Sequence, residues 1–478
     1  MWTITDKQIA AIAGSMKKEA EKIAAKHTSS NKSGSVQNDK IRDTKSGNSN
    51  NYLSSSNTNN SENAMSSSTT QLAPPPKYPT EDITTVQDNT RVVLPCLINE
   101  VLYVQHLKVP QVQKIKIKTP LDDGFGGKGM IYNKTYELEV ESFVANKPPQ
   151  NEKDIRWELG YTDDSGTIVV VALKNKGKKI KFKADDFELL GKDTTFYAYI
   201  GEEKENGAKE PIRIHNRFRW LNKTECEKEA KARKLTAELI NQGGTNTCGI
   251  AAPCYFFARD TPDIYYDTVM SIFQKGEAII PSTKYKIKVD SDEHLTEYTE
   301  SDLSTLSIDK ADFVLLATLR DQLNDFLDYD PKNDGKKTIP YSNRTMDDIV
   351  ANNFESDVRT IMDKLSNYKK IIRNVATVPI VSASIFEWTD AEGLVKDLNE
   401  KLNDGYSLAL CVNMDYIRYN KDDGNTAANH WISLVSVNYS SSSKKITLKV
   451  YTWGKTITYI VDALPFENGY FGYIAGKL

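Results

Sequence analysis

The chain has 478 residues, which is too long for one typical domain and predicts two or three folded units. A net charge of −3 and a pI of about 6.1 argue against binding to nucleic acid or to an anionic membrane. Because no run of eighteen apolar residues is present, we expect no membrane span. The N-terminal stretch also lacks the unbroken apolar segment of a secretory signal peptide.

Cysteine and histidine are both sparse. The five cysteines are odd in number and widely spaced, which is not a disulfide framework and favours synthesis in a reducing compartment such as the cytoplasm. None of the five histidines has a Cys or carboxylate at metal-ligand spacing. We therefore expect no metal and no cofactor.

The N-terminal part falls into two segments. Residues 1–27 carry apolar side chains at helical spacing after a capping box of Thr5 and Gln8, which predicts an amphipathic helix. Whether this helix binds a partner or merely frays stays open. Residues 28–81 are rich in Ser, Asn and Thr and end near three prolines, a composition typical of a flexible linker.

Residues 82–222 alternate short β-rich runs with turn signals, which predicts an all-β, immunoglobulin-like sandwich. Asp163–Gly166 and Asn175–Gly177 have the composition of hairpin turns. Trp157 and Trp220 are expected to anchor the core. The predicted strands are 90–98, 101–107, 114–118, 135–143, 155–161, 167–173, 180–183, 196–200 and 212–220.

Residues 223–478 mix helical and strand patterns, which predicts an α+β domain. Helices are expected at 226–240, 263–274, 309–327 and 345–367, and a further one after a capping box of Thr389 and Glu392 that ends near Gly405. Strands are expected at 283–289, 406–412, 430–438, 444–452 and 456–461.

The stretch NQGGTNTCGIAAPCYFF, residues 241–257, combines a Gly/Thr/Asn-rich loop with an apolar helical run. Cys248 falls in the first turn of that helix, where the helix dipole and unpaired N–H groups favour a thiolate. Gln242 lies six positions earlier and can fold back beside the sulfur to stabilise an oxyanion. The pattern predicts a nucleophilic cysteine.

A cysteine nucleophile also needs a base, and His430 is the best candidate. His430 opens an apolar strand after a polar loop, so its ring can lie at a sheet edge facing the helix of Cys248. The other histidines are expected to be structural or solvated: His27, His106, His215 and His294. Three further cysteines are expected to be buried: Cys96, Cys254 and Cys411.

Over residues 235–478 these motifs resemble the papain-like cysteine peptidase superfamily. Gln242-Gly243 followed by Cys248 is similar to the oxyanion Gln and nucleophile of that superfamily, and Asn429-His430 to its His strand. Cys248-Gly249-Ile250-Ala251 looks most like the bacterial double-glycine leader peptidase and toxin peptidase branch. The resemblance implies a papain-like fold and hydrolysis of peptide or amide bonds through a Cys248–His430 thiolate–imidazolium pair.

The third member of the site is less defined. Tyr451-Thr452-Trp453-Gly454 resembles the family's Asn-Ser-Trp-Gly segment, but Tyr451 stands where the family has its orienting Asn. Thr452 Oγ, a backbone carbonyl or a residue from elsewhere can hold the imidazole instead, so Thr452 and Tyr451 are both candidates. Trp453 covers the histidine or belongs to the core.

The layout of arm, sandwich and C-terminal hydrolase resembles bacterial toxin effectors that are secreted without a cleaved signal, as in type VI secretion. That resemblance implies an antibacterial protein with a protein or peptidoglycan-peptide substrate, a spike protein or chaperone that loads it, and a cognate immunity protein. Two alternatives stay open. One is a maturation or self-processing protease, and the other is a catalytically dead papain-like binding protein.

Overall fold

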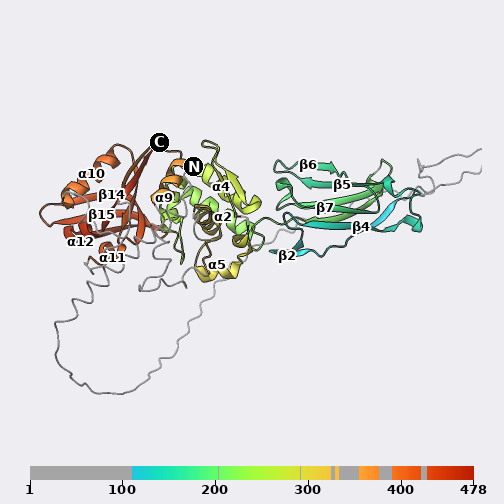
Figure 1. The fold of residues 1–478 in the computed structure, drawn as a ribbon, viewed down its shortest axis with the longest axis horizontal. Coiled ribbons are helices and arrows are strands. Elements are labelled where there is room, and N and C mark those ends of the chain that lie inside the picture. The colour runs from blue at the N-terminus through green and yellow to red at the C-terminus, as the bar shows by residue number, and fades with distance from the viewer. Residues whose placement is uncertain are drawn as a thin grey trace, which may run out of the picture. The chain divides into compact units, whose positions relative to one another are not determined.

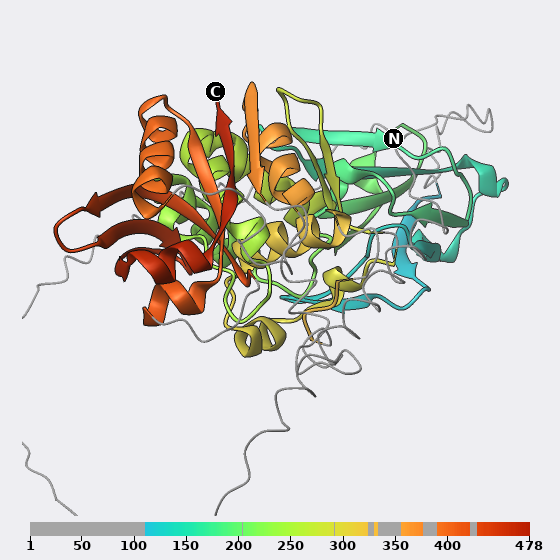
Figure 2. The same cartoon turned by 60° about the vertical axis from the view of Figure 1, so that its left-hand side comes forward.

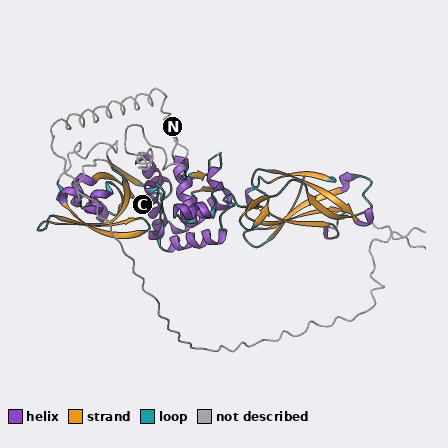
Figure 3. Cartoon of the chain, turned by 90° about the horizontal axis from the view of Figure 1, so that it is seen from below, coloured by secondary structure: helices purple, strands orange, loops and turns teal. Residues whose placement is uncertain are grey.

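The computed structural model describes residues 110–478 except 203, 291, 324–328, 333–354, 376–389 and 421–427. The predicted N-terminal helix, the linker and the first two predicted strands lie outside these residues, as do Cys96, His27 and His106. A middle region built almost wholly of strands precedes a C-terminal region in which helices surround a sheet (Figure 3). None of the helices in the described part is long and apolar enough to cross a membrane.

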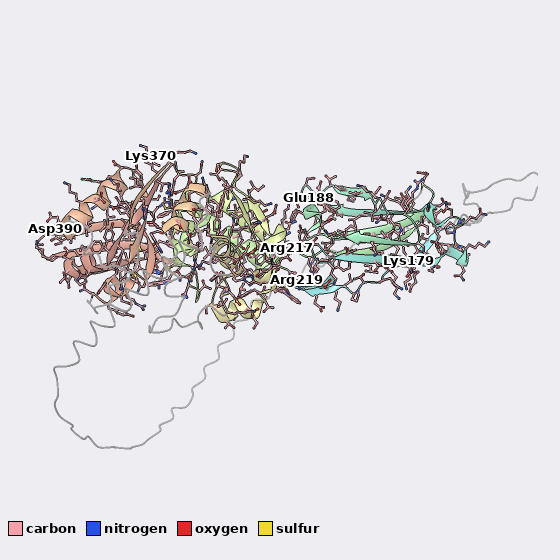
Figure 4. The ribbon with its side chains drawn as sticks, in the orientation of Figure 1. Lys179, Glu188, Arg217, Arg219, Lys370 and Asp390 are labelled. Carbon is pink, nitrogen blue, oxygen red and sulfur yellow. The ribbon has the colours of Figure 1, made fainter. Side chains whose placement is uncertain are left out.

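The middle region consists of antiparallel sheets around one apolar core. The three-stranded sheet has the order β1 (Val112–Ile117), β4 (Thr135–Phe143), β7 (Lys179–Lys183). The four-stranded sheet has the order β6 (Ile168–Ala172), β5 (Ile155–Thr162), β8 (Asp193–Ile200), β9 (Ala208–Arg213), and β2 (Asp122–Gly124) pairs with β3 (Gly127–Gly129). In β7 apolar and lysine side chains alternate, as expected for a strand with one buried face. Ile180 and Phe182 are buried, and the lysines, including Lys179 in Figure 4, are exposed.

Two predictions for this region are confirmed and two are wrong. The Asp163–Gly166 turn joins β5 to β6, and Trp157 is buried with its indole N–H donating to the Gly177 carbonyl at 2.8 Å. The Asn175–Gly177 turn closes no hairpin, because β6 and β7 belong to different sheets. The last strand ends at Arg213, so Trp220 lies beyond it and is only half-buried, with its indole N–H on Glu297 at 3.0 Å.

The C-terminal region begins with helices that share one large core. They are α2 (Lys223–Leu235), α3 (Cys248–Asp260), α4 (Pro262–Lys275), α5 (Glu300–Leu306), α6 (Lys310–Asp312), a π-helical turn (Phe313–Ala317), α7 (Thr318–Leu323) and α9 (Glu355–Lys364). A hairpin of β10 (Glu277–Ile279) and β11 (Lys286–Lys288) lies among them. The long helix predicted at 309–327 is present over Lys310–Leu323 but is interrupted by a π-turn, a feature common near functional sites, and residues 324–327 lie outside the described part.

A six-stranded antiparallel sheet completes this region, and its orange and red strands are seen in Figure 2. The strand order is β12, β17, β13, β14, β15, β16. The strands are β12 (Lys370–Val375), β13 (Ser407–Val412), β14 (His430–Ser440), β15 (Lys445–Thr452), β16 (Lys455–Asp462) and β17 (Tyr470–Lys477). The four strands predicted at 406–412, 430–438, 444–452 and 456–461 are confirmed as β13, β14, β15 and β16. The strand patterns did not predict β12 or β17.

The sheet separates two cores, and its alternating side chains explain why. In β13, Leu408 and Leu410 belong to the core shared with α10 (Ala391–Asn403), whereas Ala409 and Cys411 belong to the core of the helical part. α10, α11 (Met414–Tyr419) and α12 (Ala463–Gly469) gather around β14 and β15 (Figure 1). On the other face, the Ser433 hydroxyl of β14 donates to the Ala252 carbonyl of α3 at 2.8 Å, which joins this strand to the cysteine-bearing helix.

The helix expected after a Thr389 capping box is capped by Asp390, and Thr389 itself lies outside the described residues. Asp390, labelled in Figure 4, accepts a hydrogen bond from the Gly393 N–H at 3.0 Å and begins α10. The Asp390 carboxylate accepts a hydrogen bond from an N–H group that has no partner within the helix. Its negative charge is also stabilised by the positive end of the helix dipole. Gly405 follows the helix at φ +81°, as a C-terminal glycine should.

Candidate active site

Cys248 is the first residue of α3, where the sequence placed it. The carbonyl of Thr247 accepts hydrogen bonds from the N–H groups of Ile250 at 3.0 Å and Ala251 at 2.8 Å, which starts the helix. Nearly every residue of α3 from Cys248 to Ala258 is buried, and Cys248 itself is 4% exposed. The apolar run therefore folds as a central helix with the thiol at its N-terminal end.

Gln242 lies in the loop just before this helix, and hydrogen bonds within the loop hold it in place. Its side-chain Nε2 donates to the Thr245 carbonyl at 2.7 Å, and its carbonyl accepts from the Thr245 hydroxyl at 2.6 Å. The Thr245 hydroxyl is also 2.8 Å from that of Thr247. The loop thus folds Gln242 back toward the helix start, with one amide hydrogen engaged in the resting state.

His430 is the first residue of β14 and is 6% exposed. Its Nε2 lies 2.7 Å from the Thr452 hydroxyl, and its ring stacks on Trp453 with centroids 4.5 Å apart. Trp453 and Gly454 form the two-residue turn between β15 and β16, with φ of +49° and +75°. Positive φ at both positions is typical of a type I′ turn, which here holds the indole over the imidazole.

The structure separates the two candidates for the third member. Thr452 contacts His430, whereas the Tyr451 hydroxyl donates to the Ile240 carbonyl and its ring stacks on Tyr255 with centroids 4.3 Å apart. Adjacent residues of a strand point to opposite faces, so only one of the two can meet the histidine. Of the two candidates, Thr452 is the one whose side chain contacts the imidazole.

Cys248 contacts β14 at Trp431, the residue that follows His430. The Trp431 backbone N–H hydrogen-bonds to the Cys248 sulfur, and Trp431 packs in the same core as the cysteine. His430 and Ile432 are two residues apart in β14, so their side chains lie on the same face of the sheet. Ile432 belongs to the core on the α10 side. By this alternation the His430 side chain lies on the α10 face of the sheet, whereas Trp431 lies on the face of Cys248. The structure therefore brings the backbone of β14, and not the His430 imidazole, into contact with the sulfur.

Burial keeps both groups neutral. It raises the pKa of the Cys248 thiol above its ordinary value of 9.0, and it lowers the pKa of His430 to about 3. The N–H groups of Trp431 and Gly249 and the charge of Arg320 act in the opposite direction on the thiol but are outweighed. Burial thus acts against the thiolate–imidazolium pair that the sequence predicts, since desolvation disfavours the charged form of each group.

Arg320 is a cation near Cys248 that the sequence motifs do not reveal. It lies in α7, is 2% exposed, and its charge lowers the pKa of Cys248. Nothing in the local pattern of α7 distinguishes this arginine, since its distance from Cys248 in sequence is large. Among the described residues, no group of three or more His, Cys, Asp and Glu side chains is arranged to hold a metal ion.

The other described histidines have hydrogen-bond partners apart from Cys248, whereas Cys411 lies opposite Trp431 in the sheet and close enough to Cys248 for the charge of Cys248 to raise its pKa. His215 is buried, with Nε2 3.3 Å from the Asp122 carbonyl. His294 is not simply solvated, because Nδ1 lies 2.7 Å from Asp292 and Nε2 lies 2.8 Å from the Tyr329 carbonyl. Cys254 and Cys411 are buried as predicted.

The low pKa of His430 predicts a specific pH dependence of stability. Between pH 6.5 and about 3 the unfolded chain binds this proton and the folded chain does not, so stability is full above pH 6.5 and falls as the pH drops. The contribution of His430 to the free energy of unfolding changes by at most about 1.4 kcal/mol per pH unit in this window. Urea unfolding of His430→Gln should show a shallower acid limb over this window than the parent. Identical acid limbs would contradict the burial of a neutral imidazole.

Comparison with known proteins supplies no family for the chain. No protein-family model matches it, and no curated protein sequence matches it significantly.

Proposed function

We propose that the C-terminal region is a papain-like cysteine hydrolase that cleaves peptide or amide bonds. The observation that carries this proposal is the arrangement around β14: Cys248 begins the helix packed on that strand, and His430 begins the strand with Nε2 on Thr452. Gln242 precedes the helix in a loop folded toward its start. A nucleophile, a base and an oxyanion donor are the groups that this chemistry requires, and their order along the chain is the one that the resemblance to papain-like peptidases implies.

The proposed reaction begins from the neutral pair. When the Thr452 hydroxyl oxygen accepts a hydrogen bond from Nε2–H, Nδ1 of His430 carries a lone pair. In the proposed step Nδ1 removes the thiol proton as the Cys248 sulfur attacks the substrate carbonyl. The Gln242 amide and the Cys248 backbone N–H stabilise the oxyanion. The imidazolium then protonates the leaving amine as the C–N bond breaks, and water hydrolyses the thioester with His430 again as base.

The Thr452 hydroxyl is the testable part of this arrangement. Thr452→Val keeps the shape but removes the hydroxyl that fixes the imidazole tautomer, so we expect kcat to fall about tenfold to a hundredfold. Thr452→Ser retains the hydroxyl and should stay within a few-fold of the parent. The measurement is hydrolysis of p-nitrophenyl acetate by the full chain. Equal rates for the valine and serine variants would remove Thr452 from the mechanism.

We further propose that this hydrolase is the toxin part of a secreted antibacterial effector. The support is the order of segments along the chain, with a strand-built middle region ahead of the proposed hydrolase. In this proposal the middle region is an immunoglobulin-like sandwich that binds a spike protein or chaperone. The substrate is a protein or a peptidoglycan peptide, and an immunity protein protects the producer.

Expression in bacteria tests the toxin proposal and locates its target. The full chain should arrest growth when kept in the cytosol if the target is a cytosolic protein, or only when directed to the periplasm if the target is peptidoglycan. Both Cys248→Ala and His430→Ala should relieve the arrest. Normal growth in both compartments would favour a maturation protease, and arrest that survives both substitutions would exclude a catalytic toxin.

A further inference from the structure

The peptide group that precedes Gln242 is held at both of its polar atoms by buried side chains. Its carbonyl, from Ile240, accepts the hydroxyl of Tyr451. Its N–H, from Asn241, donates to Oδ2 of Asp312 at 2.9 Å. Ile240 is fully buried. A peptide unit is planar, so fixing both of its polar atoms fixes the direction in which the chain enters Asn241, the residue directly before Gln242.

Asp312 is itself fixed by a buried ion pair. Arg233 of α2 donates from Nε to Oδ1 at 2.7 Å and from Nη2 to Oδ2 at 2.6 Å, and both side chains are at most 3% exposed. Nη2 also reaches Oδ2 of Asp309 at 2.6 Å. Bidentate pairing leaves the carboxylate little freedom to rotate, so Asp312 presents a fixed acceptor to the loop.

The other side of the loop is equally confined. Gly243 has φ of +58°, and a Cβ there would lie 2.4 Å from the Ser307 carbonyl oxygen. The Gly244 N–H donates to the Leu306 carbonyl at 2.6 Å. Gln242 is therefore enclosed between the fixed peptide group before it and a glycine pair pressed against the end of α5 after it.

We propose that Tyr451 and the Arg233–Asp312 pair are positioning residues that set the Gln242 amide as the oxyanion donor. This inference rests on the proposed hydrolase function and adds residues from β15, α2 and α6 to it. It also assigns a role to Tyr451. By the resemblance to papain-like peptidases, Tyr451 stands at the position of the orienting asparagine, but its hydroxyl contacts the loop before Cys248 instead of the histidine.

Two reactions of Cys248 separate positioning from simple folding. With p-nitrophenyl acetate the sulfur attacks the acetyl carbonyl, the ester C–O bond breaks, and p-nitrophenolate leaves, so the rate depends on oxyanion stabilisation. With iodoacetamide the sulfur displaces iodide from a saturated carbon, and no oxyanion forms. A defect confined to the first reaction marks a misplaced oxyanion donor, whereas a loosened fold changes both.

The first variant is Tyr451→Phe, which removes one hydroxyl and keeps the ring against Tyr255. The second is the double variant Arg233→Met with Asp312→Leu, because removing either charge alone leaves the other buried and unpaired. Asp309→Asn is the matched control, since Asp309 contacts Arg233 but its side chain is 60% exposed and does not hold the loop. All are made in the full chain and checked by thermal unfolding.

We expect the acylation rate to fall about tenfold to a hundredfold in both test variants, with alkylation within about twofold of the parent and Asp309→Asn unchanged. Acylation that stays at the parent rate in Tyr451→Phe and in the double variant would overturn the positioning role. Equal loss of both reactions would overturn it too. If the parent chain is acylated no faster than Cys248→Ala, the hydrolase proposal itself fails, and that result is distinct from a failure of positioning alone.

Discussion

Cys248→Ala is expected to lower acyl transfer by about 10⁴-fold or more, to the level of the reaction without enzyme. The sulfur is the atom that forms the covalent bond in the proposed mechanism, and loss of a nucleophile typically removes most of the catalysis. Steady-state hydrolysis of p-nitrophenyl acetate, with release of p-nitrophenolate followed by absorbance, measures the effect. The same loss is expected for His430→Ala, because the two residues act as one unit and their effects should not add.

The chain offers a matched control for the cysteine. Cys254 lies six residues further along the same helix and is fully buried, and burial raises its pKa as well. Cys254→Ala should retain most of the activity because its sulfur takes no part in the reaction. Loss of activity in Cys254→Ala together with full activity in Cys248→Ala would mean that the nucleophile has been wrongly assigned.

Gln242→Ala is expected to lower kcat by about a hundredfold to a thousandfold, the usual cost of losing one oxyanion donor. The resting hydrogen bond from Nε2 to the Thr245 carbonyl uses one amide hydrogen, which leaves the second for the oxyanion. Alkylation of Cys248 by iodoacetamide should be nearly unchanged. The measurement is therefore the ratio of the two rates in the parent and the variant.

Gln242→Glu is the control for shape. It preserves the length of the side chain but has no N–H to donate when ionised, so it should be as slow as the alanine variant. A glutamate variant with parental kcat would show that the oxyanion is stabilised elsewhere, and the Gln242 loop would then have only a structural role.

Local sequence patterns predicted the elements that carry the site. Glycine and threonine before an apolar helical run located the start of α3 at Cys248, and strand alternation located the start of β14 at His430. The same rules missed β17, whose buried run YFGYIAGK does not alternate because it lies between two neighbouring strands with both faces covered. A continuous apolar run does not distinguish a strand from a buried helix.

Local sequence patterns could not predict the tertiary contacts that complete the site. The choice between Tyr451 and Thr452 depends on which face of β15 meets the histidine, and that face is set by the register with β14. Arg233 and Asp312 are 79 residues apart, so no local pattern links them. The neutral state of Cys248 and His430 likewise depends on tertiary burial, which the helix N-terminus alone does not predict.

Trapping the acyl-enzyme tests the central claim most directly. The full-length parent and its His430→Gln variant are mixed with p-nitrophenyl acetate, quenched in acid, digested, and analysed by mass spectrometry. The account predicts an acetyl group on the peptide that contains Cys248 in the parent and at least a hundredfold slower acetylation of that peptide in His430→Gln. Acetylation at other residues only, or acetylation of Cys248 at the same rate in both proteins, would contradict it.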